Sequence, residues 1–387
     1  MRRIIKNAKI YTMSEAGILE NADILIEDNK IIEVGEIDVG ADEVFNATGK
    51  LVFPGFIDAH SHLGMFEDSI GFEGDDGNED TDPVTPHMRA IDGINPCDRC
   101  FSEALSAGIT TTATGPGSTN IIGGQFAVIK TYGKRIDNMI IKAPAAIKIA
   151  FGENPKRVYK EKQKSPTTRM ATAATLRETL FKTIEYMNKK EKAAAKNEEG
   201  PDYNLKYESL IPVLKGEIPL KAHAHRADDI YTAIRIAKEF NLKLTLDHVT
   251  EGYLMLDELK KEKYPCIVGP NLTMRSKIEL KNLSFENAGK LSKNGILVAL
   301  MTDHPVIPIQ YLILCAALSV KEGMEEYEAL KAITINPAKI LGIDNRVGSI
   351  EKGKDADIVI INGHPFDTFS NIERVLVDGE IAYDAER

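Results

Sequence analysis

The chain has 387 residues, of which 43% are hydrophobic and 27% charged, and its formal net charge at pH 7 is −10. This length accommodates one large domain with a small companion, or two ordinary domains. The acidic balance argues against a nucleic-acid partner, which would need a basic surface. We also expect no membrane partner, because no apolar run approaches the roughly 20 residues that span a bilayer and the first residues lack a signal peptide's apolar core.

Four cysteines, at positions 97, 100, 266 and 315, are too few and too scattered to form a disulfide framework. We therefore expect a reducing, cytoplasmic location. Cys97 and Cys100 have the spacing of half a zinc or redox motif, but no second pair accompanies them. Because they lie in a helix-like run, we interpret them as ordinary helix residues.

Both ends of the chain predict short antiparallel strands. Apolar and polar residues alternate over 22–27 and 30–34, and again over 356–363 and 374–381, with turn formers between the runs. A short sheet from the N-terminal segment alone would bury too little apolar surface to be stable. We therefore expect residues 1–52 and 344–387 to pair into one small β-sandwich domain.

The middle of the chain, residues 53–343, predicts strands that alternate with helices. The candidate strands end near His60, Thr114, Ala143, Phe151, His225, His248, Gly269 and Asp303. Eight strands with helices between them predict a parallel, closed (β/α)8 TIM barrel, and hence an α/β fold class. The acidic insertion at 63–96 follows the first strand, and we interpret it as a solvated flap on the catalytic face, with a lid or a metal-entry route as the alternative.

Histidines gather at the predicted strand ends. Of eight in the chain, six fall at or just past the ends of four strands: His60, His62, His223, His225, His248 and His304. A lone histidine is usually structural, but the C-terminal rim of such a barrel is where catalytic groups collect. Alternate strand residues point the same way, so the imidazoles of a His-x-His pair can reach one point, and neutral imidazole is a common zinc ligand.

Residues 54–62, Pro-Gly-Phe-Ile-Asp-Ala-His-Ser-His, resemble the P-G-[FL]-[IV]-D-x-H-x-H pattern that ends the first barrel strand of the amidohydrolase superfamily. The resemblance covers nearly the whole chain: residues 336–342 look like the last barrel helix and 348–357 like the return into the β-sandwich. Within the superfamily, the sequence is most similar to the imidazolonepropionase-related and prolidase-like amidohydrolases. The resemblance implies a metal-dependent hydrolase that acts on carbon–nitrogen bonds other than peptide bonds.

The resemblance also implies that the metal ligands are His60, His62, His223, His248 and Asp303. His225 would then face the substrate or support the ligands. The ligand from the fourth strand stays open between Lys148 and Glu153. Lys148 matches members whose lysine is carbamylated and bridges two metals, whereas Glu153 would bridge the metals or be the only carboxylate of a mononuclear site. We favour Lys148; if neither binds metal, Glu153 would select a substrate amine and Lys148 would be an ordinary salt-bridged residue.

The implied cofactor is Zn²⁺, as one or two ions, with Fe, Mn or Ni as alternatives. Zn²⁺ lowers the pKa of bound water from about 15.7 to about 7, which would supply a hydroxide for attack on an amide, N-acyl or cyclic amide carbonyl. Asp303 would act as general base and then as general acid. His225 or His248 would help to stabilise the oxyanion.

The substrate is expected to be a small molecule that carries a carboxylate. Arg157, Arg169 and Arg226 fall in loops of the catalytic face, where each could bind a carboxylate bidentately, and His304 is a further substrate-binding candidate. The alternative is that these arginines pair with the acidic 63–96 segment. The sequence leaves open whether the chain is a homo-oligomer.

Three other functions stay open as alternatives. A prolidase-like dipeptidase would use the same site. A deaminase is disfavoured, because deaminating members carry an acid soon after the fifth-strand histidine, whereas His223 is followed by Ala224, His225 and Arg226. A catalytically inactive barrel that acts as a binding protein is disfavoured as well, because such a barrel would have lost ligands that this chain keeps.

Overall fold

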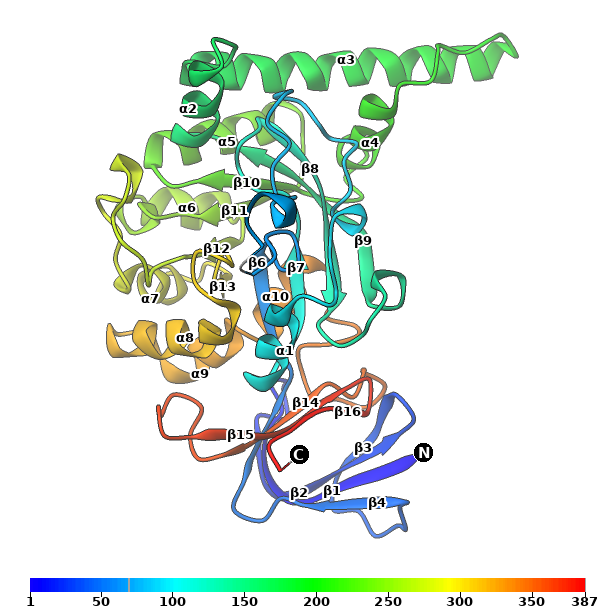
Figure 1. Ribbon diagram of the computed structural model, residues 1–387, viewed down its shortest axis with the longest axis vertical. Helices are drawn as coiled ribbons and strands as arrows, with labels where there is room; N and C mark the ends of the chain where they lie inside the picture. The colour runs from blue at the N-terminus through cyan, green and yellow to red at the C-terminus, as the bar shows by residue number, and fades with distance from the viewer. Residues whose placement is uncertain (69, 387) are drawn as a thin grey trace.

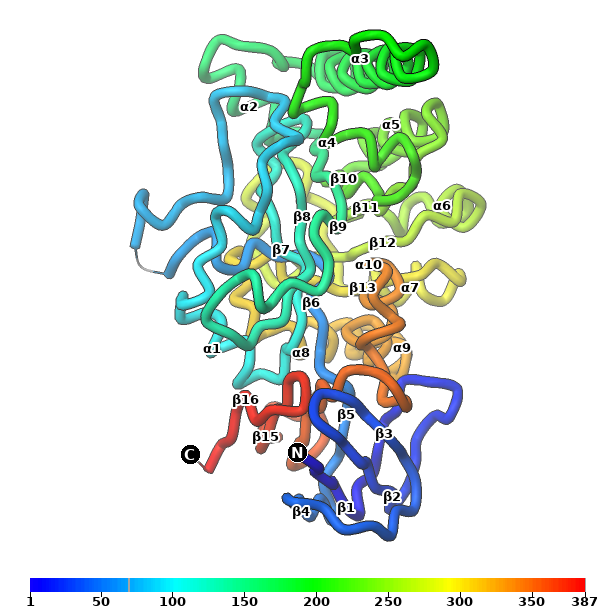
Figure 2. Tube along the Cα trace, turned by 90° about the vertical axis from the view of Figure 1, so that its right-hand side faces the viewer, coloured from blue at the N-terminus to red at the C-terminus, as the bar shows by residue number. Residues whose placement is uncertain are grey.

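The structure, a computed structural model, describes residues 1–68 and 70–386 and contains two eight-stranded sheets (Figure 1). One sheet combines strands from both ends of the chain, and the other is built from the middle. The helices accompany the second sheet, which makes the fold mixed α/β. The two chain ends lie together at one end of the molecule, and the long helix α3 (Arg169–Lys196) lies across the opposite end (Figures 1 and 2).

The terminal sheet forms because most of its strands alternate more and less buried side chains or bury a short apolar run. Its order is β16 (Glu380–Asp384), β15 (Asn371–Val377), β14 (Ile358–Asn362), β5 (Leu51–Pro54), β1 (Arg2–Tyr11), β2 (Ile18–Glu27) and β3 (Lys30–Gly35), with β4 (Glu43–Asn46) beside β1. Strand β14 pairs antiparallel with β5, with Val359 opposite Phe53. The predicted pairing of the two chain ends is confirmed, whereas a sandwich of two stacked layers and the domain boundaries stay predictions.

The second sheet curls into a nearly closed, TIM-like barrel. Its strands are β6 (Phe56–Ser61), β7 (Ile109–Thr114), β8 (Ile122–Lys130), β9 (Ile140–Ala150), β10 (Leu220–Ala224), β11 (Leu244–His248), β12 (Cys266–Val268) and β13 (Val298–Leu300). Several are buried along their whole length, which is typical of strands covered on both faces. The backbone N–H of Asp303 donates to the carbonyl of His60 at 3.1 Å and that of His62 to the carbonyl of His304 at 2.9 Å, which joins the two edges.

The expectation of eight parallel strands is wrong at one place. Strand β8 runs antiparallel to both β7 and β9, and the predicted strand ends at Ala143 and Phe151 belong to the single strand β9 or follow it directly. The reason lies in the connections. A parallel crossover needs a dozen or more residues, whereas only residues 115–121 separate β7 from β8, so the chain can only turn back as a hairpin.

Ten α-helices lie within the described ranges: α1 (Arg99–Ser106), α2 (Glu153–Glu161), α3, α4 (Leu205–Leu214), α5 (Ala227–Glu239), α6 (Leu256–Glu262), α7 (Glu286–Lys293), α8 (Leu312–Lys321), α9 (Glu326–Lys331) and α10 (Ile335–Leu341). Figure 2 shows α5, α6 and α7 on one side of the barrel sheet and the light-blue 63–96 segment on the other. Cys100 lies buried in α1, and all four cysteines are unpaired, as expected. Among the helices that the structure describes, none combines the length and the apolar character needed to cross a membrane.

A buried lysine connects the barrel to the terminal sheet. The ammonium of Lys130, at the end of β8, lies 2.7 Å from Asp357, 3.1 Å from Asp355 and 3.3 Å from Asp378, all from the C-terminal part of the chain. Its side chain and those of Asp355 and Asp357 are almost fully buried. Charges removed from water in this way are tolerated only when they are paired.

We predict that Lys130→Met lowers the free energy of unfolding by about 3–5 kcal/mol, because methionine keeps the apolar stem but leaves Asp357 and Asp378 without their cation. Urea unfolding followed by circular dichroism measures this change. Lys134→Met, at an exposed position in the next turn, is the matched control. Equal stability of the two variants would show that the buried cluster does not hold the two sheets together.

Candidate active site

Two groups of side chains converge at the rim where the parallel barrel strands end. His60, His62 and Asp303 form one group, and the other group is His223, His225 and His248. Within each group, the atoms able to bind a metal lie within 4.8 Å of one another. The rings of His60 and His248 have their centroids 5.4 Å apart, so the two groups adjoin. Strand ends that are far apart in the chain therefore lie together at one rim of the barrel.

Hydrogen bonds orient the first group. His60 Nδ1 donates to Asp247 Oδ2 at 2.5 Å, and His62 Nδ1 donates to the carbonyl of Gly115 at 2.6 Å. The Nε2 atoms of both rings then point at Asp303 Oδ1, at 3.5 Å from His60 and 3.2 Å from His62. Each imidazole thus presents a lone pair toward the carboxylate, an arrangement typical of metal-ligating histidines whose other nitrogen is held by the protein.

Two residues of the centre have a left-handed backbone. His248 has φ +74° and Asp303 has φ +54°, values that non-glycine residues rarely adopt. Consecutive residues of a regular strand point to opposite faces. The left-handed conformation breaks this alternation at the strand end, so that Asp247 and His248 can both serve the same centre. Such strain concentrates at functional sites.

The second group has buried nitrogens without hydrogen-bond partners. His248 Nδ1 donates to the carbonyl of Gly269 at 3.0 Å, and His225 Nδ1 contacts Thr250 Oγ1 at 2.7 Å. Both ring nitrogens of His223 and Nε2 of His248 lack a partner among the described residues. A buried polar atom without a partner is costly, and a divalent cation would satisfy the lone pairs that His223 and His248 direct into this site. The residues present therefore fit a metal ion.

The electrostatic environment keeps these imidazoles neutral. Burial lowers the pKa of His223 to about 4 and lowers the pKa values of His225 and His248 well below the usual histidine value. Only neutral imidazole can donate a lone pair to a metal. The second group is thus ready to bind a cation at neutral pH.

Lys148 lies at the junction of the two groups. Its fully buried ammonium is 3.0 Å from His60 Nε2, and burial lowers the pKa of this lysine to about 8. Glu153 lies in the first turn of α2, and in the described part of the chain its side chain is not part of either metal-binding group. The structure thus brings Lys148, rather than Glu153, against a predicted ligand.

A cavity of 370 Å³ opens above the centre. Among its lining residues are His62, His223, His225, Asp303 and Arg157. The 63–96 segment contributes residues 66 and 78 to the wall, so this part of the predicted flap borders the candidate site.

Two of the three predicted substrate-binding arginines have carboxylate partners. Arg169 binds Asp229 at 2.9 and 3.0 Å, and Arg226 binds Asp228 at 2.9 and 3.0 Å. These partners belong to the first turn of α5, not to the acidic 63–96 segment. Among the three arginines, only Arg157 lines the cavity.

His304 lies just beside the cavity rather than in its lining. Its Nδ1 accepts from the backbone N–H of Ile309 at 3.2 Å. Its ring is therefore engaged in holding the loop that follows β13.

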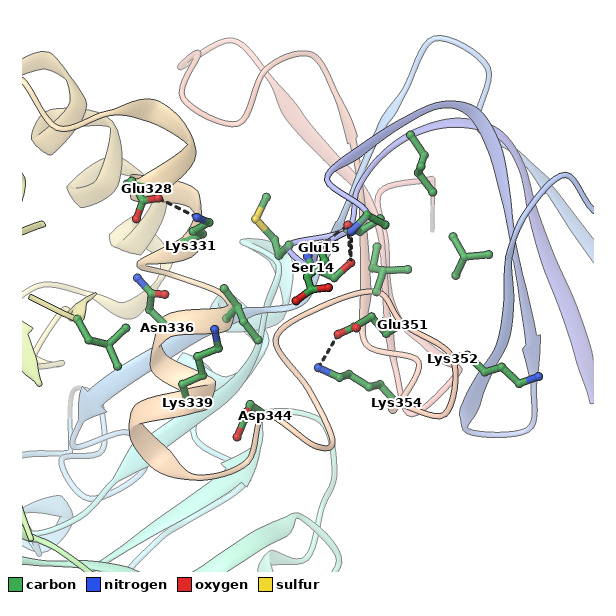
Figure 3. Close-up of a pocket in the computed structure, with 18 of the residues that line it drawn as sticks. Ser14, Glu15, Glu328, Lys331, Asn336, Lys339, Asp344, Glu351, Lys352 and Lys354 are labelled. Carbon is green, nitrogen blue, oxygen red and sulfur yellow. Dashed lines mark hydrogen bonds and ion pairs between the residues drawn. The ribbon is translucent and has the colours of Figure 1, made fainter. Parts of the chain in front are cut away.

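A larger cavity, of 1340 Å³, lies between the terminal sheet and the barrel helices (Figure 3). Its described lining contains no histidine. Lysines there pair with neighbouring glutamates, Lys331 with Glu328 at 2.8 Å and Lys354 with Glu351 at 2.9 Å. The residues that line this cavity do not form a set of metal ligands. We therefore place the candidate site at the histidine rim.

Three residues of the site were missed by the sequence analysis: Asp247, Lys277 and Glu279. Asp247 had a signal, because it is an acid in a predicted barrel strand, directly before the predicted ligand His248, and a buried acid needs a partner. Lys277 and Glu279 had no such signal. Glu279 lies in a short 3₁₀ turn, η5 (Ile278–Leu280), and Lys277 directly precedes it, and no sequence periodicity predicts a turn of this kind. Lys277 lines the cavity, and its ammonium lies 2.7 Å from Glu279 Oε1.

Comparison with known proteins agrees with this geometry. A crystal structure of an amidohydrolase from Thermotoga maritima MSB8 is 47% identical, covers 99% of this chain and 100% of that one, and superposes with a TM-score of 0.96. Amidohydrolase tasK of Hapsidospora irregularis is 28% identical over 366 residues, which are 88% of this chain but 37% of that protein.

Two prokaryotic relatives match over most of their length. A 5-methylthioadenosine/S-adenosylhomocysteine deaminase of Thermoanaerobacter pseudethanolicus is 26% identical and covers 94% of this chain and 85% of the relative. An imidazolonepropionase of Picrophilus torridus is 26% identical, and the match covers 93% of this chain and 91% of the relative. The sequence model of the amidohydrolase family matches residues 51–382, so the chain belongs to the amidohydrolase family, whose hydrolases act on carbon–nitrogen bonds.

Proposed function

We propose that the chain is a metal-dependent amidohydrolase that cleaves an amide, N-acyl or cyclic amide bond in a small substrate carrying a carboxylate. One observation carries the proposal: five buried imidazoles and Asp303 form two adjoining groups beside a cavity, and the second group contains buried ring nitrogens without a partner among the described residues. His60, His62 and Asp303 would hold one ion, and His223, His248 and His225 would hold a second. We propose Zn²⁺, with Fe, Mn or Ni as alternatives.

When bound, a divalent cation would lower the pKa of a water molecule and polarise the carbonyl oxygen of the scissile bond. The remaining work falls to the chain's own side chains. Asp303 accepts the proton of the attacking water at a carboxylate oxygen and passes it to the leaving nitrogen. Because Thr250 and the second ion would engage both ring nitrogens of His225, we do not propose this histidine as a donor to the oxyanion.

Electrostatics suit Asp303 to this role. Burial alone would raise the pKa of this carboxyl, but its neighbours His62, His60 and Lys148 hold the pKa well below its usual range. Asp303 is therefore ionised before the reaction, as a proton acceptor must be. Its low proton affinity favours the return of the proton to the leaving nitrogen.

We further propose that Lys148 acts as a carbamate. As an ammonium it donates to His60 Nε2, the very lone pair that a metal would need. With a pKa of about 8, about one tenth of the amine is neutral at pH 7 and can attack carbon dioxide. The Nζ lone pair forms a bond to the carbon while one C=O π bond opens onto oxygen, and one N–H proton leaves to water. The side chain then offers two carboxylate oxygens, and its nitrogen keeps a single hydrogen. The contact with His60 favours this role for Lys148 over a metal-bridging role for Glu153.

Arg157 supports a carboxylate-bearing substrate. Its guanidinium makes no ion pair within residues 1–68 and 70–386, and it lines the same cavity as Asp303. A substrate carboxylate bound there would place an adjoining amide above the histidines. N-acyl amino acids, dipeptides and lactams with a carboxylate all satisfy this arrangement, so a prolidase-like dipeptidase remains the alternative for the same site.

Deamination is the second alternative, supported by the similarity to a deaminase. It would use the same base, but the carbonyl carbon would be replaced by an amidine carbon and the leaving group would be ammonia. The fifth-strand motif lacks the acid of deaminating members, since Arg226 follows His225 and pairs with Asp228. A purine and pyrimidine panel tests this alternative through ammonia release.

We predict that Asp303→Asn retains at least one metal ion but loses turnover by at least about 100-fold, because the second group of histidines still binds a cation while the proton acceptor is gone. Metal content is measured by mass spectrometry, and hydrolysis is measured on a panel of N-acyl amino acids, dipeptides and lactams. Chelated wild-type protein, reconstituted with zinc with and without bicarbonate, tests the metal and the carbamate.

The matched control is Asp257→Asn, an exposed acid in the first turn of α6. A fully active Asp303→Asn would remove the proposed role of the carboxylate. Hydrolysis that continues unchanged after complete chelation would refute the metal-dependent reaction, and reconstitution indifferent to bicarbonate would refute the carbamate.

We predict that Arg157→Ala lowers kcat/KM for a carboxylate-bearing substrate by about 10- to 100-fold, because a charge-assisted hydrogen bond is worth about 1.5–3 kcal/mol. The same substrate with its carboxylate converted to a neutral amide should show little difference between the two proteins. Lys160→Ala, at an exposed position in the same helix, is the control. If Arg157→Ala lowers kcat/KM equally for the carboxylate substrate and for its neutral amide, Arg157 does not bind the carboxylate.

A further inference from the structure

Glu279 is a buried carboxylate that faces the second histidine group. It lies in η5, between β12 and α7, and its side chain is 1% exposed. Its Oε1 atom is 3.9 Å from His223 Nε2 and 3.8 Å from His225 Nε2. Its Oε2 atom accepts the backbone N–H of Glu153 at 3.0 Å. One carboxylate oxygen is thus held by the backbone while the other is turned toward the imidazoles.

These distances are too long for hydrogen bonds but suit ligands of one ion. Zinc binds nitrogen at about 2.0–2.1 Å and carboxylate oxygen at about 2.0–2.2 Å, so tetrahedral ligands lie roughly 3.4 Å apart. The carboxylate oxygen and the two Nε2 atoms need to approach by only a few tenths of an ångström. His223 Nε2 has no other partner among the described residues.

Charge balance points the same way. Three neutral imidazoles bring no negative charge to a buried divalent cation, and the ammonium of Lys277 adds positive charge beside His223 and His225. Glu279 is the carboxylate that the structure places against two members of the group. Burying a charge without an opposite charge nearby is very costly, so a carboxylate at this position would stabilise the bound second ion.

We propose that Glu279 is a ligand of the second metal ion, which completes a site of three imidazoles and one carboxylate with His223, His225 and His248. This inference rests on the proposed function, which supplies the metal. The ammonium of Lys277 lies 2.7 Å from the same Oε1 atom, so Lys277 and the ion would share the charge of this carboxylate. The second ion is therefore fixed by β10, β11 and the segment after β12, independently of the group that contains Asp303.

Two other roles for Glu279 make different predictions. Recognition of a substrate amine would require the carboxylate to border the cavity, but Glu279 is not among the described residues that line it. A purely structural role, in which Glu279 ties α2 and Lys277 together, would affect folding but not the affinity of one particular ion.

The test is a titration of metal-free protein with Co²⁺ and Zn²⁺, followed by visible absorption and calorimetry. Wild type is expected to bind two ions in separable steps. Glu279→Gln keeps the shape and the acceptor for the Glu153 N–H but loses the charge, and it should weaken one step by at least about 100-fold while leaving the other unchanged. His62→Ala should weaken the other step. Glu286→Gln, an exposed acid paired with Lys290, is the matched control and should bind like wild type.

The outcomes separate the two proposals. If Glu279→Gln binds both ions as wild type does, or if it weakens both steps alike and unfolds at a lower temperature without metal, Glu279 is structural and the inference is overturned while the proposed function stands. If wild type itself binds no ion, both fail together. Selective loss of one metal-binding step in Glu279→Gln, with an unchanged melting temperature of the metal-free protein, supports Glu279 as a ligand of the second ion.

Discussion

The hydrogen bond between His60 and the buried carboxylate of Asp247 is the contact on which the centre depends. Asp247 Oδ2 accepts from His60 at 2.5 Å and from the ammonium of Lys221 at 2.9 Å, and Oδ1 accepts from Thr245 at 3.0 Å. Three strands, β6, β10 and β11, therefore share one buried acid. Such a charge is tolerated because each of its oxygens is satisfied. The result is that His60 presents Nε2, and no other nitrogen, to Asp303 and Lys148.

A second acid closes the barrel beside this network. Asp58 Oδ2 accepts from the backbone and the hydroxyl of Thr302, and Oδ1 accepts from the backbone N–H of His60. Burial raises the pKa of Asp58 to about 7, and the hydrogen bonds from Thr302 and His60 limit the rise. Because β6 and β13 meet through side chains and strand-end backbone contacts, Asp303 is held where it can face both His60 and His62.

The centre and its cavity divide the charges between them. The interior carries ionisable groups that act on each other and, in the proposed function, on a metal, namely Lys148, Asp247, Asp303 and Glu279. The cavity wall carries Arg157, which has no internal carboxylate among the described residues and is free for a substrate. Catalysis by metal and proton transfer can thus be separated from recognition of the substrate's charge. The 63–96 segment contributes residues 66 and 78 to the wall of this cavity.

The sequence by itself determined the features that depend on neighbours in the chain. The His60-x-His62 pair on one strand, the six histidines at strand ends and the pairing of the two chain ends follow from local periodicity, which is two residues in any strand. Only the tertiary structure decided the contact of Lys148 with His60, the pairing of Arg169 with α5, and the approach of Glu279 to His223 and His225. The contacts of Lys148, Arg169 and Glu279 depend on which distant segments touch, and no local pattern encodes them. Arg226 instead pairs with Asp228 two residues away, and the reversal of β8 follows from the short 115–121 connection.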